Sequence, residues 1–166
     1  MGVRNKDEFV GLIKKHYGII YKICNIYGGN YREDLQQEIV YQLWKSYPSF
    51  KGRSKFQTWM YRVALNTALF EAKKVNREYT ELKNFENTNG ESPEELTEKI
   101  NRIEQLYFNI SKLNDVDKAI TLLYLEKCSY KEIAEITGMT EKNVGIRLFR
   151  IKNKLKQMFN QQEAKP

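Results

Sequence analysis

The sequence has a single histidine and two cysteines among its 166 residues, so it has few of the side chains that bind metals or act as nucleophiles. His16 has no second histidine with which to share a metal ion or complete a triad, and we assign it no role. Cys24 and Cys128 form no C-x-x-C unit and sit among apolar residues, so we expect buried, inert thiols. A phosphate-binding glycine loop is also missing. These absences make an enzyme the least favoured function class, and we expect neither a cofactor nor a bound metal.

Long apolar runs are missing as well. The longest are far shorter than the roughly 18 residues that a membrane-spanning helix needs, and the first residues, MGVRNKDEFV, lack the apolar core of a signal peptide. We therefore expect a cytoplasmic protein with no membrane insertion. What the chain does have is positive charge, with a net charge of +7 and a pI of about 9.3. That balance favours an anionic partner, either nucleic acid or a membrane surface.

Residues 129–155 carry the local signals of a helix-turn-helix. Ser129 and Glu132 have the spacing of a capping box, which predicts that a helix begins near Tyr130. Gly138 stands where a left-handed residue ends that helix, and Thr140 can cap the next one. The apolar residues of the second helix recur with the period of one buried stripe, formed by Val144, Leu148, Ile151 and Leu155.

The other faces of this second helix are strongly basic. Like charges at Arg147, Arg150 and Lys154 destabilise an isolated helix by a few tenths of a kcal/mol per pair. We therefore expect a compensating partner outside the helix, and DNA phosphate is the favoured one. A solvated basic face is the alternative. The residues concerned are Lys142, Asn143, Arg147, Arg150, Lys152, Lys154 and Lys156, against the single acid Glu141.

A second informative stretch, residues 44–62, mixes aromatic rings with cations, and no acid occurs between Lys45 and Phe70. Such a mixture suits single-stranded nucleic acid, because rings stack on unpaired bases while cations follow the backbone. The alternative is that the rings are core, and we expect this for at least part of Trp44, Phe56 and Trp59. The rings are Trp44, Tyr47, Phe50, Phe56, Trp59 and Tyr61, and the cations are Lys51, Arg53, Lys55 and Arg62.

Helical spacing of apolar residues predicts an all-α fold. One amphipathic helix is expected over residues 7–27, another over 34–44 and a third from Phe56 onward, after a loop marked by Pro48 and Gly52. An acidic stretch at 81–98 separates these from further helices at 93–108 and 113–125. We therefore expect two small helical domains joined by a flexible linker, the second a four-helix domain containing the helix-turn-helix.

Three motifs, in this order, resemble those of the extracytoplasmic-function subfamily of bacterial sigma-70 family RNA polymerase sigma factors. They are D-L-x-Q-E-x-x-x-x-L-W from Asp34, F-x-T-W-x-Y-R-[IV]-A-x-N from Phe56, and S-Y-x-E-I-A-E-x-x-G-x-[ST]-x-x-x-V-x-x-R-L-x-R from Ser129. The resemblance implies a non-catalytic protein that binds core RNA polymerase and promoter DNA. It also implies region 2 at 1–78, an acidic linker at 79–92, region 4 at 93–160 and a tail at 161–166. Acidity of the linker suits either the positively charged channels of polymerase or an ordinary solvated loop.

The resemblance also implies three sets of binding residues. The set for core polymerase is Asp34, Leu35, Gln37, Glu38, Leu43 and Trp44. The set for melting and reading the minus-ten element is Ser49, Phe50, Lys51, Arg53, Lys55, Trp59, Arg62, Asn66 and Thr67. The set for the minus-thirty-five element is Thr140, Lys142, Asn143, Ile146, Arg147, Phe149 and Arg150. Gly145 and Ile146 depart from the polar or basic residues usual in the family, so apolar contact with a thymine methyl becomes possible at Ile146.

Two further points stay open at the level of sequence. A free-standing helix-turn-helix regulator would use residues 93–160 to bind duplex DNA and the N-terminal half to sense or dimerise. The D-L-x-Q-E helix followed by the aromatic loop favours a sigma factor instead. An anti-sigma factor is a partner of many but not all members of the subfamily, and it would cover either the Asp34–Trp44 face or the 143–150 face.

Overall fold

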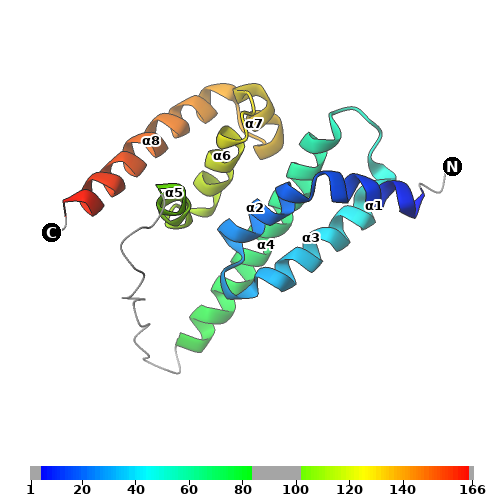
Figure 1. Cartoon of the computed structure of the whole chain (residues 1–166), viewed down its shortest axis with the longest axis horizontal. Helices are drawn as coiled ribbons and strands as arrows, with labels where there is room; N and C mark the ends of the chain where they lie inside the picture. Colours follow the sequence, from blue (N-terminus) through cyan, green and yellow to red (C-terminus); the bar gives the residue numbers. More distant parts are fainter. Residues whose placement is uncertain (1–4, 84–101, 165–166) are drawn as a thin grey trace.

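The computed structural model describes residues 5–83 and 102–164, and the regular structure in those ranges is entirely helical. The N-terminal half contains α1 (Lys6–Lys15), α2 (Tyr17–Tyr27), α3 (Arg32–Ser46) and α4 (Phe56–Lys83), with short 3-10 helices at Gly29–Tyr31 and Tyr47–Ser49. The C-terminal half contains α5 (Arg102–Ser111), α6 (Asp115–Leu125), α7 (Tyr130–Thr137) and α8 (Glu141–Glu163). The expected all-α fold of two small helical domains is confirmed. The two halves lie side by side, with α6 and α7 next to α2 and α4 (Figure 1).

The core of the N-terminal half lies where α2, α3 and α4 pack against one another. Each helix contributes a stripe of apolar side chains at helical spacing, and removing one such side chain from water stabilises the fold by about 1.5–3 kcal/mol. The fully buried residues of this core include Ile20, Ile23, Ile39, Leu43 and Met60. Ala64 and Ala68 are also buried on α4, and their small side chains allow the neighbouring helices to approach closely.

The single helix expected over residues 7–27 is wrong, because the chain forms α1 and α2 with a break at His16. His16 has φ −111° and ψ 18°, and its N–H bonds to the carbonyls of Leu12 and Ile13, which ends α1. Gly18 lies two residues further on, in the first turn of α2, and glycine is a weak helix former that lowers the cost of an interruption at this point. The break places Phe9 against Trp44, with ring centroids 5.0 Å apart, while Ile20 and Ile23 enter the core.

Gly28 has a packing role that its interpretation as a simple helix breaker misses. A Cβ atom at Gly28 would lie 2.5 Å from the carbonyl oxygen of Cys24 and 2.7 Å from the Cα of Arg32. Both neighbours are backbone or near-backbone atoms that cannot move aside cheaply. The glycine therefore allows the end of α2 to approach the start of α3.

The C-terminal half is built around α8, which packs against α5, α6 and α7. Its core includes Ile110, Ile120, Leu122, Leu123 and Ile133, all fully buried. The expected four-helix domain with a helix-turn-helix is confirmed in the described part of the chain, as α5 to α8.

The described residues only partly cover the expected domain boundaries. α4 continues to Lys83, so the first residues assigned to the 79–92 linker are helical. The rest of that linker, 84–92, and the expected helix start at Pro93 lie outside the described residues. α8 continues to Glu163, into the segment 161–166 assigned to a tail.

At two glycines of the helix-turn-helix, the structure predicts that substitution by alanine has opposite effects on the stability of the protein. Gly138 has φ 75°, so Gly138→Ala should destabilise the protein by about 1 kcal/mol. Gly145 lies inside α8, where a Cβ would make only ordinary contact with the Tyr130 ring at 3.5 Å. Gly145→Ala should therefore stabilise by about 1 kcal/mol, because alanine is the better helix former. Urea unfolding followed by circular dichroism measures both, and a shift of the same sign in the two variants would contradict this account.

Candidate nucleic-acid and protein interfaces

The helix-turn-helix forms as its local sequence predicts. The Ser129 hydroxyl oxygen accepts the N–H of Glu132 at 3.2 Å, and the Glu132 carboxylate accepts the N–H of Ser129 at 2.8 Å. These hydrogen bonds from Ser129 hold the pKa of Glu132 below its usual range. Thr140 caps α8 by accepting the N–H of Asn143 at 3.2 Å. The capping box, the left-handed glycine and the second cap are thus confirmed.

The outward face of α8 is opposite its buried stripe of Val144, Leu148 and Ile151. Two apolar side chains are exposed there, Ile146 at 42% and Phe149 at 69%. The other members of the minus-thirty-five set on this exposed surface are Lys142, Asn143 and Arg150. Thr140 precedes the helix and is occupied as its cap. The surface therefore combines cations, an amide and two exposed apolar groups.

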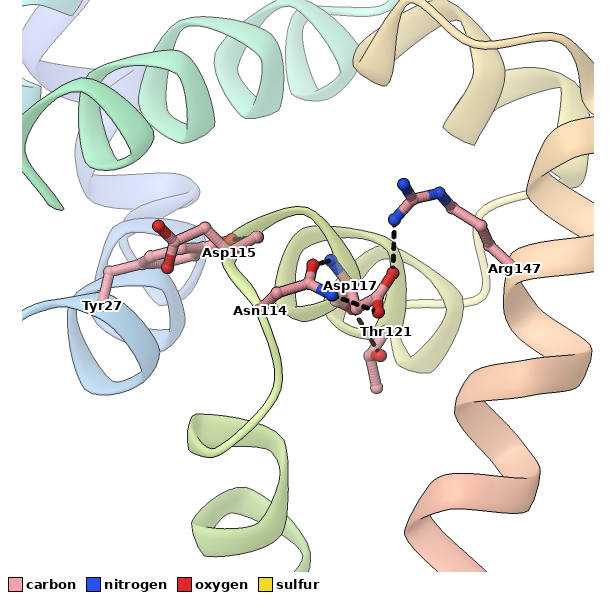
Figure 2. A network of polar contacts seen from close by, with 6 residues as sticks. All are labelled: Tyr27, Asn114, Asp115, Asp117, Thr121 and Arg147. Carbon is pink, nitrogen blue, oxygen red and sulfur yellow. Dashed lines mark hydrogen bonds and ion pairs between the residues drawn. The ribbon is translucent and has the colours of Figure 1, made fainter. Parts of the chain in front are cut away.

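Arg147 lies apart from the rest of its predicted set. Its Nη1 donates to Oδ1 of Asp117 at 2.7 Å, and the two side chains are 39% and 17% exposed (Figure 2). Asp117 is itself fixed, because Asn114 Nδ2 donates to its other carboxylate oxygen at 2.7 Å. Asn114 also caps α6 by accepting the N–H of Asp117 at 2.9 Å. Arg147 therefore points to the start of α6, away from the outward face of α8.

The aromatic residues around the 49–55 loop form one packed cluster. The ring centroids of Phe50 and Trp59 are 5.2 Å apart, and those of Phe56 and Trp59 are 5.4 Å apart. Tyr47 is buried beneath them, 6.2 Å from Trp59. Much of the ring surface expected to stack on bases is thus in contact with other rings. The partial core role expected for Phe56 and Trp59 is confirmed, and the cluster anchors the loop to α4.

The loop itself presents polar and basic groups to solvent. Ser49, Lys51, Arg53 and Lys55 are all exposed, and Gly52 adopts φ 70°, which turns the chain between the two central cations. Ser49 donates its hydroxyl to the carbonyl of Ser46 at 2.6 Å, which fixes the start of the loop. The arrangement supplies cations on a short, anchored loop.

The remaining members of the minus-ten set lie on α4, and their side chains differ in exposure and in hydrogen bonding. Asn66 is exposed on the helix surface. Thr67 is half-buried and donates its hydroxyl to the carbonyl of Val63 at 2.8 Å. Arg62 is exposed, but its Nη2 donates to the backbone carbonyl of Glu135 on α7 at 2.9 Å.

The set expected to bind polymerase divides into core and surface. Leu35 and Leu43 are buried in the fold, so they are not available to a partner. Asp34, Gln37 and Trp44 are exposed on α3, whereas Glu38 is half-buried and accepts a hydrogen bond from Gln42 at 2.8 Å. The buried leucines support the helix that presents the exposed residues.

A groove between α1 and α3 adds residues that sequence reasoning missed. It has a volume of about 550 Å³ and is lined by both helices, including Val10, Gln37, Val40, Tyr41 and Trp44. Tyr41 is 55% exposed and lies one helical turn from both Gln37 and Trp44. That spacing was available in the sequence as a signal. Large apolar side chains exposed together in a groove are typical of a protein-binding surface.

No group of metal-binding side chains converges in the described residues. Cys24 is buried as expected, and burial raises the pKa of its thiol to about 11. Cys128 is only half-buried, and its pKa is also raised by burial. His16 is half-buried, with Nδ1 3.3 Å from Gln57 Nε2. Within the described ranges, no helix is long and apolar enough to cross a membrane.

Comparisons with known proteins match both halves of the chain. The Sigma-70 region 2 family model matches residues 12–78, and the Sigma-70, region 4 model matches residues 110–155. An ECF RNA polymerase sigma-E factor from Haemophilus influenzae is 33% identical over 144 residues, covering 76% of this chain and 75% of the relative. The RNA polymerase sigma factor YlaC from Bacillus subtilis is 27% identical over 161 residues, covering 93% of each chain.

Solved structures with the same arrangement of helices also exist. The sigma factor RpoE in complex with the anti-sigma factor NepR from Bartonella quintana has a TM-score of 0.72 and covers 94% of this chain and 98% of that one. CnrH in complex with the cytosolic domain of CnrY has a TM-score of 0.66, with 95% and 90% covered. Sequence identity is 19% in both cases, so these similarities establish the fold alone.

The ion pair between Arg147 and Asp117 predicts that the two side chains act as a unit. A double-mutant cycle with Arg147→Ala and Asp117→Ala should give a coupling free energy of about 0.5–1 kcal/mol in unfolding, reduced from that of a buried pair by solvent screening. The cycle of Asp117→Ala with Arg150→Ala is the control, because Arg150 makes no ion pair with any described residue. Equal coupling in both cycles would show that the contact with Asp117 contributes nothing specific.

Proposed function

The chain belongs to the extracytoplasmic-function subfamily of sigma-70 family RNA polymerase sigma factors, and from that premise we propose which of its surfaces bind core polymerase and which bind promoter DNA. It is a sigma factor that binds core RNA polymerase and directs promoter-specific transcription initiation. Sigma factors in general are regulatory rather than catalytic proteins. Both halves match the family, which disfavours a free-standing regulator with an N-terminal sensing domain.

The proposed surface for core polymerase is the outward stripe of α3 together with the groove beside α1. Asp34, Gln37, Tyr41 and Trp44 follow one another at intervals of three or four residues along α3, so they share one face. Asp34 supplies negative charge, and Tyr41 and Trp44 supply exposed aromatic surface. An acidic and aromatic face suits a partner helix that combines basic and apolar residues.

The proposed surface for the minus-ten element is the basic loop and the adjoining face of α4. Lys51, Arg53 and Lys55 would bind phosphates, and Arg62 and Asn66 would lie along the separated strand. The packed rings of Phe50 and Trp59 would present their remaining exposed edges to an unpaired base. The observation that supports this proposal is the exposure of the loop cations beside an aromatic cluster that holds the loop in place.

The proposed surface for the minus-thirty-five element is the outward face of α8. Lys142, Asn143 and Arg150 would contact phosphates and base edges, and Ile146 and Phe149 would meet apolar groups in the major groove. Arg147 would orient α8 on α6 through Asp117 rather than read a base. We assign region 2 to residues 1–78, the linker to 79–92, region 4 to 93–160 and the tail to 161–166.

An anti-sigma factor would use one of these same faces. The structural neighbours described above are complexes with the anti-sigma factor NepR and with the cytosolic domain of CnrY. A partner of that kind on this chain would cover either the Asp34–Trp44 face or the 143–150 face. A pull-down of such a partner with the tagged chain and with its Tyr41→Ala variant tells the two faces apart. Weaker capture by the variant indicates the Asp34–Trp44 face, and equal capture indicates the 143–150 face.

Mixing the purified chain with core polymerase that lacks other sigma factors tests the polymerase surface directly. Tyr41→Ala should weaken the complex about tenfold, because an exposed aromatic anchor at the centre of an interface carries a large share of its binding energy. Transcripts from a genomic fragment library should fall in parallel. Phe108→Ala is the matched control, since Phe108 is an exposed aromatic residue on α5 and belongs neither to the groove nor to a proposed DNA-binding surface. Equal losses in the two variants would remove the α3 face from the assignment.

Ile146 predicts a base contact that can be tested by removing a single methyl group. Once the transcripts define the minus-thirty-five element, each thymine in it is replaced in turn by deoxyuracil. One replacement should weaken holoenzyme binding about fourfold, the loss expected for one buried methyl group. Ile146→Ala should bind less tightly and should be insensitive to that same replacement. If holoenzyme with Ile146→Ala still binds less tightly when that thymine loses its methyl group, another residue makes the contact.

A further inference from the structure

An open cavity lies where the turn between α6 and α7 meets α2 and the start of α4. These helices are neighbours in the structure (Figure 1). The cavity has a volume of about 390 Å³, which is in the range of sites that hold small molecules. Of its lining residues, only Lys55 belongs to a surface proposed for promoter DNA or polymerase. The cavity is therefore a feature that the proposed function leaves unexplained.

The lining of this cavity has a surplus of positive charge. His16 also lies in the lining, and burial, together with the charge of Lys15, lowers its pKa, so His16 adds no charge at neutral pH. The charged residues are four lysines and two glutamates, so two positive charges remain uncompensated. They are Lys15, Lys22, Lys55, Lys127, Glu126 and Glu132.

The surplus belongs to two particular lysines. Glu126 pairs with Lys22, and Glu132 Oε1 lies 3.7 Å from Lys55 Nζ. The other two lysines are exposed and make no ion pair with any described residue. One comes from each half of the chain. They are Lys15, the last residue of α1, and Lys127, in the turn between α6 and α7.

Lys127 occupies a backbone position that is usually taken by glycine. Its φ is 61°, and within residues 5–83 and 102–164 no other residue except glycine has a positive φ. Its N–H bonds to the carbonyl of Tyr124 at 3.0 Å, and the N–H of Cys128 bonds to the carbonyl of Leu123 at 3.1 Å. These are the two hydrogen bonds that close a helix with a left-handed residue. Lysine is strained in this conformation and glycine is not, and retained strain of this kind is a sign of function.

Neutral donors complete the lining. Gln57 Nε2 lies 3.3 Å from His16 Nδ1, and Thr58 follows it at the start of α4. An amide and a hydroxyl can donate hydrogen bonds to an anion whose charge the lysines balance. A phosphate group carries nearly two negative charges at neutral pH and three acceptor oxygens, so it matches both the surplus and the donors. A single carboxylate would balance only half of the surplus.

We propose that this cavity is a binding site for a phosphate dianion, held chiefly by Lys15 and Lys127. The phosphate is either free or the terminal group of a small molecule whose remainder fills the rest of the cavity. Lys55 is 78% exposed and its pair with Glu132 is long, so its ammonium can turn to the same phosphate. Because the two unpaired lysines come from different halves of the chain, a bound phosphate stabilises the folded protein.

An NMR titration of the ¹⁵N-labelled chain with sodium phosphate, AMP and adenosine tests the site without DNA or polymerase. Ionic strength is held constant with sodium chloride, because salt screens exposed charges. Phosphate and AMP should shift amide signals within 15–22, 55–61 and 126–132, and adenosine should not. Tighter binding of AMP than of phosphate indicates a phosphorylated small molecule, and equal binding indicates free phosphate. Absence of binding by both, or shifts confined to other amides, would overturn the site.

Lys127→Gly separates a binding role from a structural one, because two measurements should move in opposite directions. The Tm of the ligand-free protein, followed by circular dichroism, should rise by about 2–4 °C as the backbone strain is relieved. The affinity for phosphate should fall about fivefold to tenfold with the loss of one charged donor. Lys131→Ala is the matched control, since Lys131 is exposed on α7 and does not line the cavity. It should bind phosphate nearly as well as the unchanged protein.

Lys15→Ala and Lys14→Ala form the second matched pair, on the other side of the cavity. Both residues are exposed at the end of α1, but only Lys15 lines the cavity. Lys15→Ala should weaken phosphate binding about fivefold to tenfold, and Lys14→Ala should leave it nearly unchanged. Equal losses within each pair would mean that phosphate associates with a diffuse basic surface, and would overturn the site.

Discussion

The packing of α4 on several sides at once is the constraint on which the rest of the structure depends. Its buried stripe, with Met60, Ala64 and Ala68, joins the core formed with α2 and α3. Another side carries Trp59, whose contacts with Phe50 and Phe56 hold the basic loop. A third side carries Arg62, which reaches α7. Because one rigid helix carries all three, the loop, the proposed strand-binding face and the contact with the C-terminal half keep a fixed geometry relative to one another.

Signals that act within a few residues were predictable from the sequence, and those that act between distant segments were not. The Ser129–Glu132 box and the left-handed Gly138 depend only on their own turn of chain, so the helix-turn-helix was predicted nearly to the residue. The ion pair of Arg147 joins residues thirty positions apart, so only the fold reveals it. Leu35 and Leu43 match a binding motif in sequence, yet a motif does not distinguish a leucine that contacts a partner from one that supports the helix.

The basic charge of α8 is partly compensated inside the protein. Arg147 pairs with Asp117, and Lys152 donates to the Tyr124 hydroxyl at 3.0 Å while its ammonium lies 4.4 Å from that ring. These contacts relieve some of the repulsion that a run of like charges creates along one helix. The cations that point outward, among them Lys142 and Arg150, are not compensated in this way and still favour an external anion. Internal pairing thus divides the cations of α8 into those that position the helix and those that remain exposed on its outward face.

The packing of the two halves against each other leaves the proposed binding surfaces unequally exposed. The groove of Tyr41 and Trp44 faces solvent, whereas Arg62 is in contact with α7. The proposed polymerase surface is therefore exposed in this structure, whereas the proposed minus-ten surface is partly covered by α7.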